Sequence, residues 1–170
     1  MRKMGFSDTF VECVQVLYTD IVSVCLINGH HSNPFRIDRG VRQGCPLSMI
    51  LYIITQESLY LTIKQSQHIK AIETPCKTKQ LLGYADDTTI IIRSDLCMIY
   101  VFTILKNFHL ASSIKLNMKK TKKFGFGEWQ SRQDWPYRDI TVESSNISIL
   151  GIVFAHDITD ALEMQWVEVI

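Results

Sequence analysis

The spacing of hydrophobic and polar positions changes along the chain, and the first changes predict a helix followed by paired strands. An amphipathic helix is expected over residues 8–19, with Ser7 as its N-cap. Its apolar stripe, which we expect to pack on a sheet, consists of Phe10, Cys13, Val14, Leu17 and Tyr18. Residues 21–27 favour a strand, and the Asn-Gly pair at 28–29 predicts a turn. Residues 35–37 alternate on the return, which predicts a hairpin or a long-looped β-pair.

Two longer helices are expected further along the chain. Residues 49–65 are apolar nearly all round in their first half, which predicts a central buried helix with Glu57 and Lys64 turned outward. Ser94 precedes a second helix, over residues 95–112, as its N-cap. The face of this helix that we expect to be buried consists of Leu96, Ile99, Phe102, Leu105 and Phe108.

Short runs of β-branched and aromatic residues predict the remaining strands. Residues 69–74, closed by Pro75, read as a short strand. Residues 124–126 alternate like a strand, and residues 147–154 predict a last one. The polar stretch 128–138 between them predicts an exposed loop.

At residues 80–92 an apolar run, two adjacent carboxylates and a β-branched run follow one another. Residues 80–84 and 88–92 can pair as a hairpin whose tip carries Asp86 and Asp87. Adjacent carboxylates disfavour each other's ionisation, and a hard divalent cation such as Mg²⁺ removes that problem. Successive strand side chains point to opposite faces, so one carboxylate should be the better ligand, and we choose Asp86. The alternative is a solvated turn, which an Asp-Asp pair alone would favour.

Two further stretches carry groups that could contact phosphate. Residues 39–48 place two arginines, a glutamine and two glycines before a helix, and Pro46 suits the first helical turn. A ligand-binding loop and an ordinary polar loop fit these residue types about equally well. Five lysines between positions 115 and 123 leave a similar choice, between a phosphate-facing patch and a solvated turn.

Composition limits the class of protein without naming a partner. The 170 residues suffice for one domain with a core, and a hydrophobic fraction of 46% is ordinary for a soluble globular protein. A net charge of +1 means that nucleic-acid binding would need a local patch. Five scattered cysteines without C-x-x-C spacing predict reduced thiols, no disulfide partner and an intracellular location. The apolar run at residues 49–54 is too short to span a membrane, so no membrane partner is expected.

Taken in order, these pieces resemble the palm of reverse transcriptases, most closely the non-LTR retrotransposon enzymes, with group II intron enzymes as cousins. Residues 84–87 (YADD) look like the family's Y-A-D-D catalytic hairpin, and residues 39–48 (RGVRQGCPLS) look like the block before the long palm helix. Residues 115–121 are similar to the L-K-x-N-x-x-K-T segment, and residues 150–152 look like the L-G strand near the primer grip. The resemblance covers about residues 5–154.

The resemblance implies an α+β fold, a partial polymerase palm with an antiparallel sheet whose catalytic hairpin packs against two to three helices. It also implies template-directed DNA synthesis, with an RNA template, a DNA primer and dNTP as partners and two Mg²⁺ ions as cofactors. Asp86 would be the bridging metal ligand and Asp87 the supporting carboxylate. The residues implied at the template and nucleotide site are Arg42, Gln43, Gly44, Tyr84 and Lys120, and those implied at the primer grip are Leu150 and Gly151.

Three positions depart from the family pattern. Met49 stands where the family usually has Pro, Ser113 replaces a Gly in the turn before the lysines, and Gly83 replaces a residue that is often Ala. The family also has an earlier motif, an Asp followed by an aromatic-Asp pair, whose pattern surrounds neither Asp8 nor Asp20.

These departures shape the expected organisation. We expect residues 1–154 to be a partial reverse-transcriptase palm and residues 155–170 to be the truncated start of a thumb or connection. With one metal-ligating motif missing, we expect the 170 residues alone to be inactive in primer extension. The alternatives are a non-catalytic RNA- or DNA-binding remnant and a poorly folded product.

Overall fold

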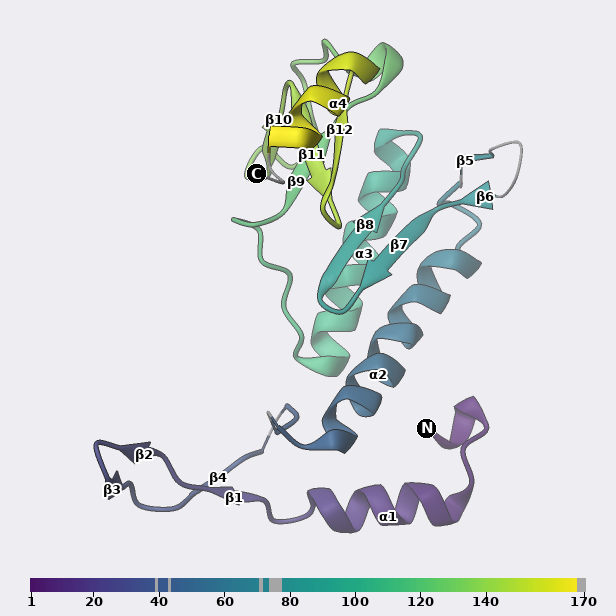
Figure 1. Cartoon of the computed structure of the whole chain (residues 1–170). Coiled ribbons are helices and arrows are strands. Elements are labelled where there is room, and N and C mark those ends of the chain that lie inside the picture. Colours follow the sequence, from purple (N-terminus) through teal and green to yellow (C-terminus); the bar gives the residue numbers. More distant parts are fainter. Residues whose placement is uncertain (39, 43, 71, 74–77, 168–170) are drawn as a thin grey trace. The chain divides into compact units, whose positions relative to one another are not determined.

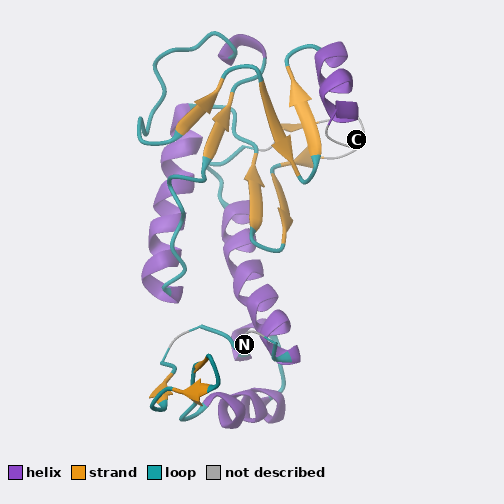
Figure 2. Ribbon diagram, turned by 60° about the vertical axis from the view of Figure 1, so that its left-hand side comes forward, coloured by secondary structure: helices purple, strands orange, loops and turns teal. Residues whose placement is uncertain are grey.

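The computed structural model describes all residues except 39, 43, 71, 74–77 and 168–170. Helices and short strands are mixed along the chain, which confirms the α+β class (Figures 1 and 2). The chain divides into two compact units, residues 1–56 and residues 57–170, and each unit is described by itself.

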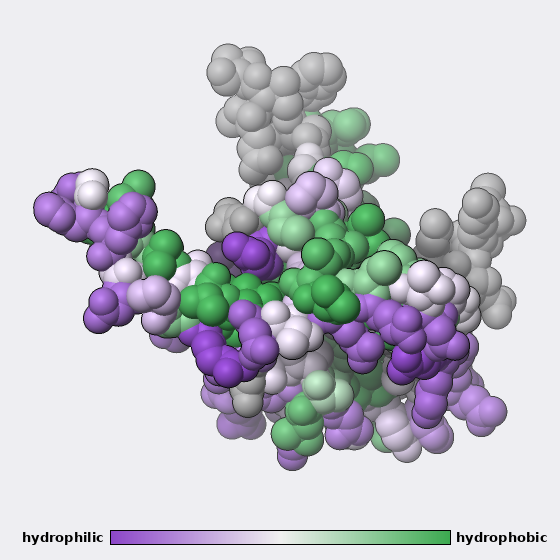
Figure 3. All heavy atoms as spheres, turned by 90° about the horizontal axis from the view of Figure 1, so that it is seen from below, coloured by the Kyte–Doolittle hydropathy of each residue, from purple (hydrophilic) through white to green (hydrophobic). Residues whose placement is uncertain are grey.

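The first unit contains the short 3₁₀ turn η1 (Arg2–Met4) and helix α1 (Asp8–Tyr18). The Ser7 hydroxyl accepts a hydrogen bond from the Phe10 backbone N–H at 3.3 Å, so the expected N-cap is confirmed. The expected packing of the apolar stripe on a sheet is not found within this unit: Val11 is buried, while Leu17 is 62% exposed. Figure 3 shows hydrophobic atoms at the surface beside hydrophilic ones on the face that it presents.

The strands of the first unit form two antiparallel pairs. β1 (Val22–Ser23) pairs with β4 (Phe35–Arg36), and β2 (Leu26–Ile27) pairs with β3 (His30–His31). The Asn-Gly turn at 28–29 is confirmed, because both residues have positive φ, 50° and 82°, as a type I′ hairpin turn requires. The single strand expected over residues 21–27 is instead divided between the two pairs.

Helix α2 (Pro46–Gln65) begins three residues before the expected start, with Pro46 as its first residue. Its second half is buried as expected, since Leu59 is 8% and Ile63 0% exposed, but its first half is not, since Met49 is 63% exposed. The outward placement of Glu57 and Lys64 is confirmed: their charged groups lie 3.9 Å apart and both side chains are nearly half exposed.

Helix α3 (Asp95–Ser112) begins and ends where the sequence predicts, with the Ser94 hydroxyl accepting from the Cys97 backbone N–H. The prediction of which face of α3 is buried is partly wrong. Leu105 and Phe108 pack against the core, but Leu96 and Ile99 are 58% and 46% exposed. The buried positions are Cys97, Met98 and Val101, because the helix turns a neighbouring stripe toward α2.

The core of the second unit lies between these two helices and a β-hairpin. Its buried members are Leu59 and Ile63 of α2, Ile69, and Val101 of α3. The partly buried residues that pack against them are Tyr60, Leu81, Ile90, Ile92, Tyr100, Ile104, Leu105 and Phe108. The expected packing of the central hairpin against helices is therefore confirmed, with two helices.

The remaining strands of the second unit also pair two by two in the described residues, where one antiparallel sheet was expected. β5 (Ile72–Glu73) lies within the stretch 69–74 where a short strand was predicted, and it pairs with β6 (Thr78–Lys79), which was not predicted. β9 (Lys122–Phe124) and β10 (Thr141–Glu143) run parallel, because the long intervening segment, which includes the 3₁₀ turn η2 (Gly127–Trp129), returns the chain to the same end.

The predicted last strand is wrong. The stretch forms a hairpin of β11 (Asn146–Ile149) and β12 (Ile152–Ala155), and Leu150 and Gly151 are its turn. Both turn residues have positive φ, 54° and 77°, which reverses the chain where a continuous strand would need negative φ. Helix α4 (Ile158–Val167) follows and contacts β12, and the expected division at residue 155 stays a prediction.

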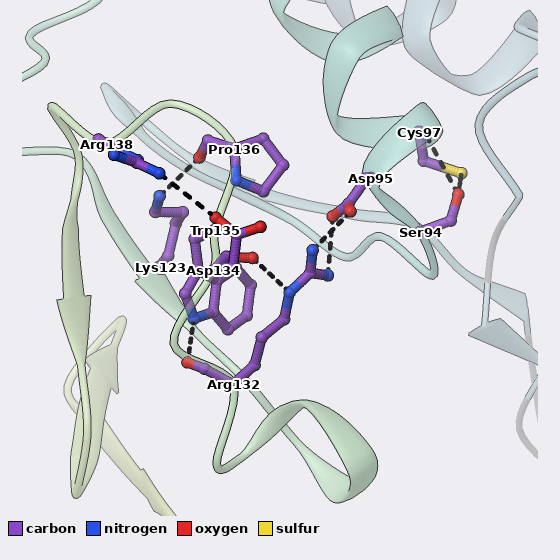
Figure 4. A network of polar contacts seen from close by, with 9 residues as sticks. All are labelled: Ser94, Asp95, Cys97, Lys123, Arg132, Asp134, Trp135, Pro136 and Arg138. Atoms are coloured by element: carbon purple, nitrogen blue, oxygen red, sulfur yellow. Dashed lines mark hydrogen bonds and ion pairs between the residues drawn. The ribbon is translucent and has the colours of Figure 1, made fainter.

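The polar stretch 128–138 is mostly exposed, as its composition predicts, but side-chain contacts tie it to the rest of the second unit (Figure 4). The Arg132 guanidinium makes two hydrogen bonds to the Asp95 carboxylate, at 2.9 and 2.6 Å. Its carbon centre lies 4.6 Å from the Trp129 ring centroid and 5.6 Å from that of Trp135, and the Trp135 indole N–H donates to the Arg132 carbonyl. The Asp95 carboxylate raises the pKa of Arg132, so this contact ties the segment to the start of α3.

Candidate metal and nucleic-acid site

The two adjacent carboxylates lie where strands β7 (Leu81–Tyr84) and β8 (Asp87–Ile90) meet. Tyr84 pairs with Asp87, so the turn consists of only Ala85 and Asp86. Ala85 has φ 49°, an uncommon conformation for a residue with a side chain, which persists only where the surroundings hold it. The predicted hairpin is confirmed, with Asp86 in the turn and Asp87 as the first residue of the returning strand.

The hairpin turns one face to the core and leaves the other open. Leu81 and Ile90 are directly opposite each other and pack against the core, and Gly83 and Thr88 form the next pair on that face. Asp87 and Tyr84 belong to the opposite face, and Tyr84 is 71% exposed. Neither Asp86 nor Asp87 makes an ion pair with any other residue that the structure describes. Both carboxylates are exposed and available to a ligand.

The donor set fits part of a magnesium site. Carboxylate oxygens are the protein ligands that Mg²⁺ prefers, and one or two of them suffice when water and phosphate oxygens complete an octahedron. In the described part of the chain, no group of three or more His, Cys, Asp or Glu side chains could hold a metal ion. A magnesium ion at this hairpin would therefore have Asp86 and Asp87 as a pair of ligands, with the remaining positions left to other donors.

Contacts with α2 and with the chain after it fix the base of the hairpin. The Gln80 side-chain amide donates to the Ile69 carbonyl at 2.6 Å and to the Ile63 carbonyl at 3.3 Å. The Ile91 backbone N–H donates to the Gln80 carbonyl at 2.8 Å, which extends the ladder by one pair. Closer to the turn, the Tyr60 hydroxyl lies 2.8 Å from the Thr88 hydroxyl. One feature of the sequence could have indicated this contact: Gly83 is a glycine inside a strand, which often marks a close approach.

The loop that resembles the family's R-G-V-R-Q-G block belongs to the first unit. Arg42 is exposed, Gly44 has φ 83° with open space where a side chain would start, and Gln43 lies outside the described residues. The buried Ser48 hydroxyl donates to the Arg42 carbonyl at 2.6 Å and lies 3.1 Å from the Tyr18 hydroxyl. Ser48 thus holds the end of this loop against the start of α2, a role that its sequence position did not reveal.

Cys45 precedes α2 and is held at the same place. The Leu47 backbone N–H, followed by contacts with Ser48 and Tyr18, lowers the pKa of the Cys45 thiol. Cys13, Cys25 and Cys97 are free thiols as well, and Cys76 lies outside the described residues.

The five lysines between positions 115 and 123 divide into two groups. Lys122 makes an ion pair with Glu143 at 2.8 Å. Lys123 is buried, its ammonium donates to the carbonyls of Pro136 and Tyr137 at 2.8 and 3.0 Å, and burial lowers its pKa. Lys122 is exposed but paired, and the exposed lysines without an ion pair to any described residue are Lys115, Lys119 and Lys120. The choice between a phosphate-facing patch and a solvated turn therefore concerns three of the five lysines and stays open.

The exposed Lys120 lies in a turn built on Asn117. The Lys120 backbone N–H donates to the Asn117 carbonyl at 3.1 Å and to its side-chain oxygen at 3.3 Å, and the Thr121 hydroxyl donates to the same carbonyl. Before this turn, Ser113 ends α3 with φ 63°, in the left-handed region that favours glycine. The departure noticed in the sequence therefore falls on a position with a conformational cost.

Comparison with known proteins identifies the class to which this fold and hairpin belong. Residues 2–154 match the family described as "Reverse transcriptase (RNA-dependent DNA polymerase)", and the chain belongs to that family. The family uses divalent metal ions and acts on a nucleic-acid template and primer. Within the ranges that the structure describes, no helix is long and apolar enough to cross a membrane.

The similar proteins come from non-LTR retrotransposons. The chain is 27% identical over 155 residues to "Transposon TX1 uncharacterized 149 kDa protein" of Xenopus laevis. It is 28% identical over 96 residues to "Retrovirus-related Pol polyprotein from type-1 retrotransposable element R2" of Popillia japonica. The matches cover 89% and 56% of this chain but 12% and 16% of those two proteins, so the chain spans a small part of their length. The resemblance that the motifs carried is confirmed.

Proposed function

We propose that this chain is the palm segment of a non-LTR retrotransposon reverse transcriptase, and that Asp86 and Asp87 hold the catalytic Mg²⁺ ions of RNA-templated DNA synthesis. The observation that supports this is the hairpin itself. Two exposed carboxylates without ion-pair partners among the described residues lie at a two-residue turn, and two helices hold its strands. This occurs in a chain that belongs to the reverse transcriptase family.

The reaction joins the primer 3′-oxygen to the α-phosphorus of the dNTP and breaks the bond to the bridging oxygen, which leaves as pyrophosphate. Bound Mg²⁺ would favour ionisation of the 3′-hydroxyl and stabilise negative charge on the leaving group. Asp86 in the turn is proposed as the ligand shared between the ions, and Asp87 as the supporting carboxylate. The protein otherwise positions the reactants and neutralises charge, because phosphoryl transfer needs little else from it.

Other residues are proposed for substrate contacts. The exposed Arg42 guanidinium and the open backbone at Gly44 suit phosphate and close backbone contact, and Gln43, which lies outside the described residues, is proposed with them from the sequence. Tyr84 is 71% exposed on the face of Asp87, so its ring is free to contact a nucleotide. Lys120 is proposed near the triphosphate, and the Leu150-Gly151 turn at the primer grip.

The second candidate is RNA or DNA binding without chemistry. The exposure of Lys115, Lys119 and Lys120 favours it, because exposed lysines neutralise phosphates without needing a metal site. Only two metal-binding carboxylates come together in the described residues, so we expect primer extension by the 170-residue chain to be undetectable even if it binds metal.

Metal binding tests the proposed site directly. Mn²⁺ would be titrated into the chain and free Mn²⁺ measured by electron paramagnetic resonance, with the Asp86→Asn and Asp87→Asn variants. Asp139→Asn is the matched control, since Asp139 is also an exposed carboxylate next to a turn. We expect at least about tenfold weaker binding for Asp86→Asn and no change for the control. Equal affinity for Asp86→Asn and the parent chain would exclude the proposed site.

Binding of an RNA–DNA duplex at several salt concentrations tests the second candidate. If binding survives the Asp86→Asn change and falls steeply with salt, the lysines carry it and phosphate contact is its basis. Extension of a DNA primer on an RNA template by the 170-residue chain, abolished by Asp86→Asn, would contradict the expected inactivity while supporting the assigned ligands.

A further inference from the structure

Gly83 lies inside a strand, and its conformation does not explain why it is glycine. It is not among the glycines with positive φ. It pairs with Thr88, one position before the Tyr84–Asp87 pair that closes the turn. A Cβ at position 83 would lie 2.5 Å from Cζ and 2.6 Å from Cε2 of Tyr60, with the Tyr60 hydroxyl oxygen closer still. A side chain at position 83 would therefore have to displace the Tyr60 ring, which fills the volume that this side chain would take.

Tyr60 reaches this place from a rigid base. Its neighbour Leu59 is 8% exposed, Ile63 one turn further along α2 is fully buried, and Tyr60 itself packs against the same core. Its hydroxyl lies 2.8 Å from the Thr88 hydroxyl, so one side chain of α2 covers one strand of the hairpin and hydrogen-bonds the other. The contact thus joins Tyr60 of α2 to Gly83 of β7 and Thr88 of β8.

We propose that Tyr60 is a positioning residue for the two metal-binding carboxylates. Its ring rests on the backbone of Gly83 and its hydroxyl holds Thr88, which fixes the strand pair adjacent to Asp87 and to the turn that carries Asp86. This inference rests on the proposed function for the identity of the site, and on the contacts of Tyr60 for the mechanism.

The physical reason is the weakness of a short hairpin by itself. An isolated two-stranded hairpin is marginally stable in water, and this one has four-residue strands. Its turn also carries Ala85 at φ 49°, which adds conformational cost. The pair held by Tyr60 is one residue, about 3.3 Å, from the Tyr84–Asp87 pair, so a displacement there passes directly to both carboxylates.

The hydrogen bond is tested by three variants in the Mn²⁺ titration, at a temperature where circular dichroism shows every variant folded. Tyr60→Phe and Thr88→Val each remove the bond and are expected to weaken Mn²⁺ binding about fivefold, while Thr88→Ser restores the hydroxyl and keeps the parent affinity. The control is Tyr100→Phe, because Tyr100 packs against the same core from α3, with its ring stacked on His68. The double variant Tyr60→Phe/Thr88→Val should bind no more weakly than either single variant.

The close approach is tested by Gly83→Ala. We expect weaker Mn²⁺ binding and a lower melting temperature in the parent chain, and no further change when Gly83→Ala is added to Tyr60→Ala, which removes the ring. If Tyr60→Ala does not fold, the Thr88 variants decide the question.

The outcomes separate this inference from the proposed function. If the parent chain binds Mn²⁺ through Asp86 and Tyr60→Phe binds it equally well, Tyr60 does not position the site, although the proposed function stands. If the parent chain binds no Mn²⁺, the proposed function fails. The amide chemical shifts of Ala85, Asp86 and Asp87 then decide whether Tyr60 positions the turn. Shifts that change in Tyr60→Phe but not in Tyr100→Phe support positioning, and unchanged shifts overturn it.

Discussion

The hairpins β7–β8 and β11–β12 have the same dimensions and are stabilised in different ways. Each has two four-residue strands joined by a two-residue turn. The β7–β8 hairpin packs on α2 and α3, which come from other parts of the chain, and its turn contains one residue with positive φ. The β11–β12 hairpin has two successive turn residues with positive φ and contacts α4, which follows it directly.

The difference concerns which interactions determine each turn. In β11–β12 the successive positive φ angles of Leu150 and Gly151 have the sign of a type I′ turn, whose twist suits paired strands, although leucine itself disfavours positive φ. In β7–β8 the turn Ala85–Asp86 is less favourable by itself, and contacts from α2 compensate. The hairpin with the paired carboxylates is thus the one whose geometry depends on tertiary packing. This packing is relevant to the proposed metal site, because metal ligands must be held within a fraction of an ångström by the residues around them.

The largest effect is expected where the support of the first hairpin is removed. Ile63→Ala should lower the free energy of unfolding by about 3 kcal/mol, because it leaves a cavity at a fully buried position. Ile99→Ala is the matched control: Ile99 is a helical isoleucine of α3 that is 46% exposed, and less than about 1 kcal/mol should be lost. Urea unfolding measures both, and equal losses would contradict the placement of the core.

The next effect concerns the contact that joins α3, which supports the first hairpin, to the segment leading toward the second. Arg132→Gln should lower the free energy of unfolding by about 1–2 kcal/mol, because Arg132 makes two hydrogen bonds to a partly exposed Asp95. Arg138→Gln should cost about nothing, since Arg138 and Asp134 are 89% and 87% exposed and 3.7 Å apart. Thermal unfolding of the two variants compares two Arg–Asp pairs of one segment, and a larger loss for Arg138→Gln would reverse the assignment.

A substitution in the β11–β12 turn is expected to stabilise the protein and to test how much the turn conformation costs. Leu150→Asn would create Asn-Gly, the dipeptide that already forms the β2–β3 turn with nearly the same φ values. We expect a gain of about 1 kcal/mol, because asparagine tolerates positive φ better than leucine does. Leu150→Ala removes the same exposed side chain without that tolerance and should bring no such gain. Chemical denaturation distinguishes the two, and equal stability of both variants would show that the turn conformation is not limiting.

The smallest effect is expected at the start of α4, beside the second hairpin. Hydrogen bonds from the Thr159 hydroxyl and backbone N–H lower the pKa of Asp157 below its ordinary value of 3.8. Asp157 therefore binds a proton less readily in the folded state than in the unfolded state. Its hydrogen bonds to Thr159 stabilise α4 fully at pH values above the ordinary pKa, and this stabilisation is lost as the pH falls through the lowered pKa. The amide shift of Thr159 should follow this titration, and Asp157→Asn should abolish it without affecting amides of β7–β8.

The sequence by itself determined the features that depend on neighbouring residues. The N-caps at Ser7 and Ser94, the bounds of α3 and the Asn-Gly turn follow from local hydrogen bonding and backbone preference. The family also followed from the sequence, because the Y-A-D-D tetrad and the ten-residue block are continuous in it. Leu150 shows the limit of such rules, since a leucine at positive φ contradicts its own preference and the strand expected there was wrong.

Only the tertiary structure decided what depends on residues far apart in the chain. The buried face of α3 depends on where α2 lies, so Cys97 and Met98 are buried while Leu96 and Ile99 are exposed. Lys123 and Arg132 are less exposed than their polar surroundings in the sequence predict. The Pro136 carbonyl accepts a hydrogen bond from Lys123, and the Trp129 ring and Asp95 contact Arg132. The contacts of Tyr60 could not be predicted for the same reason. Tyr60 contacts Gly83 and Thr88, which lie 23 and 28 positions away in the chain, and local sequence patterns do not relate residues so far apart.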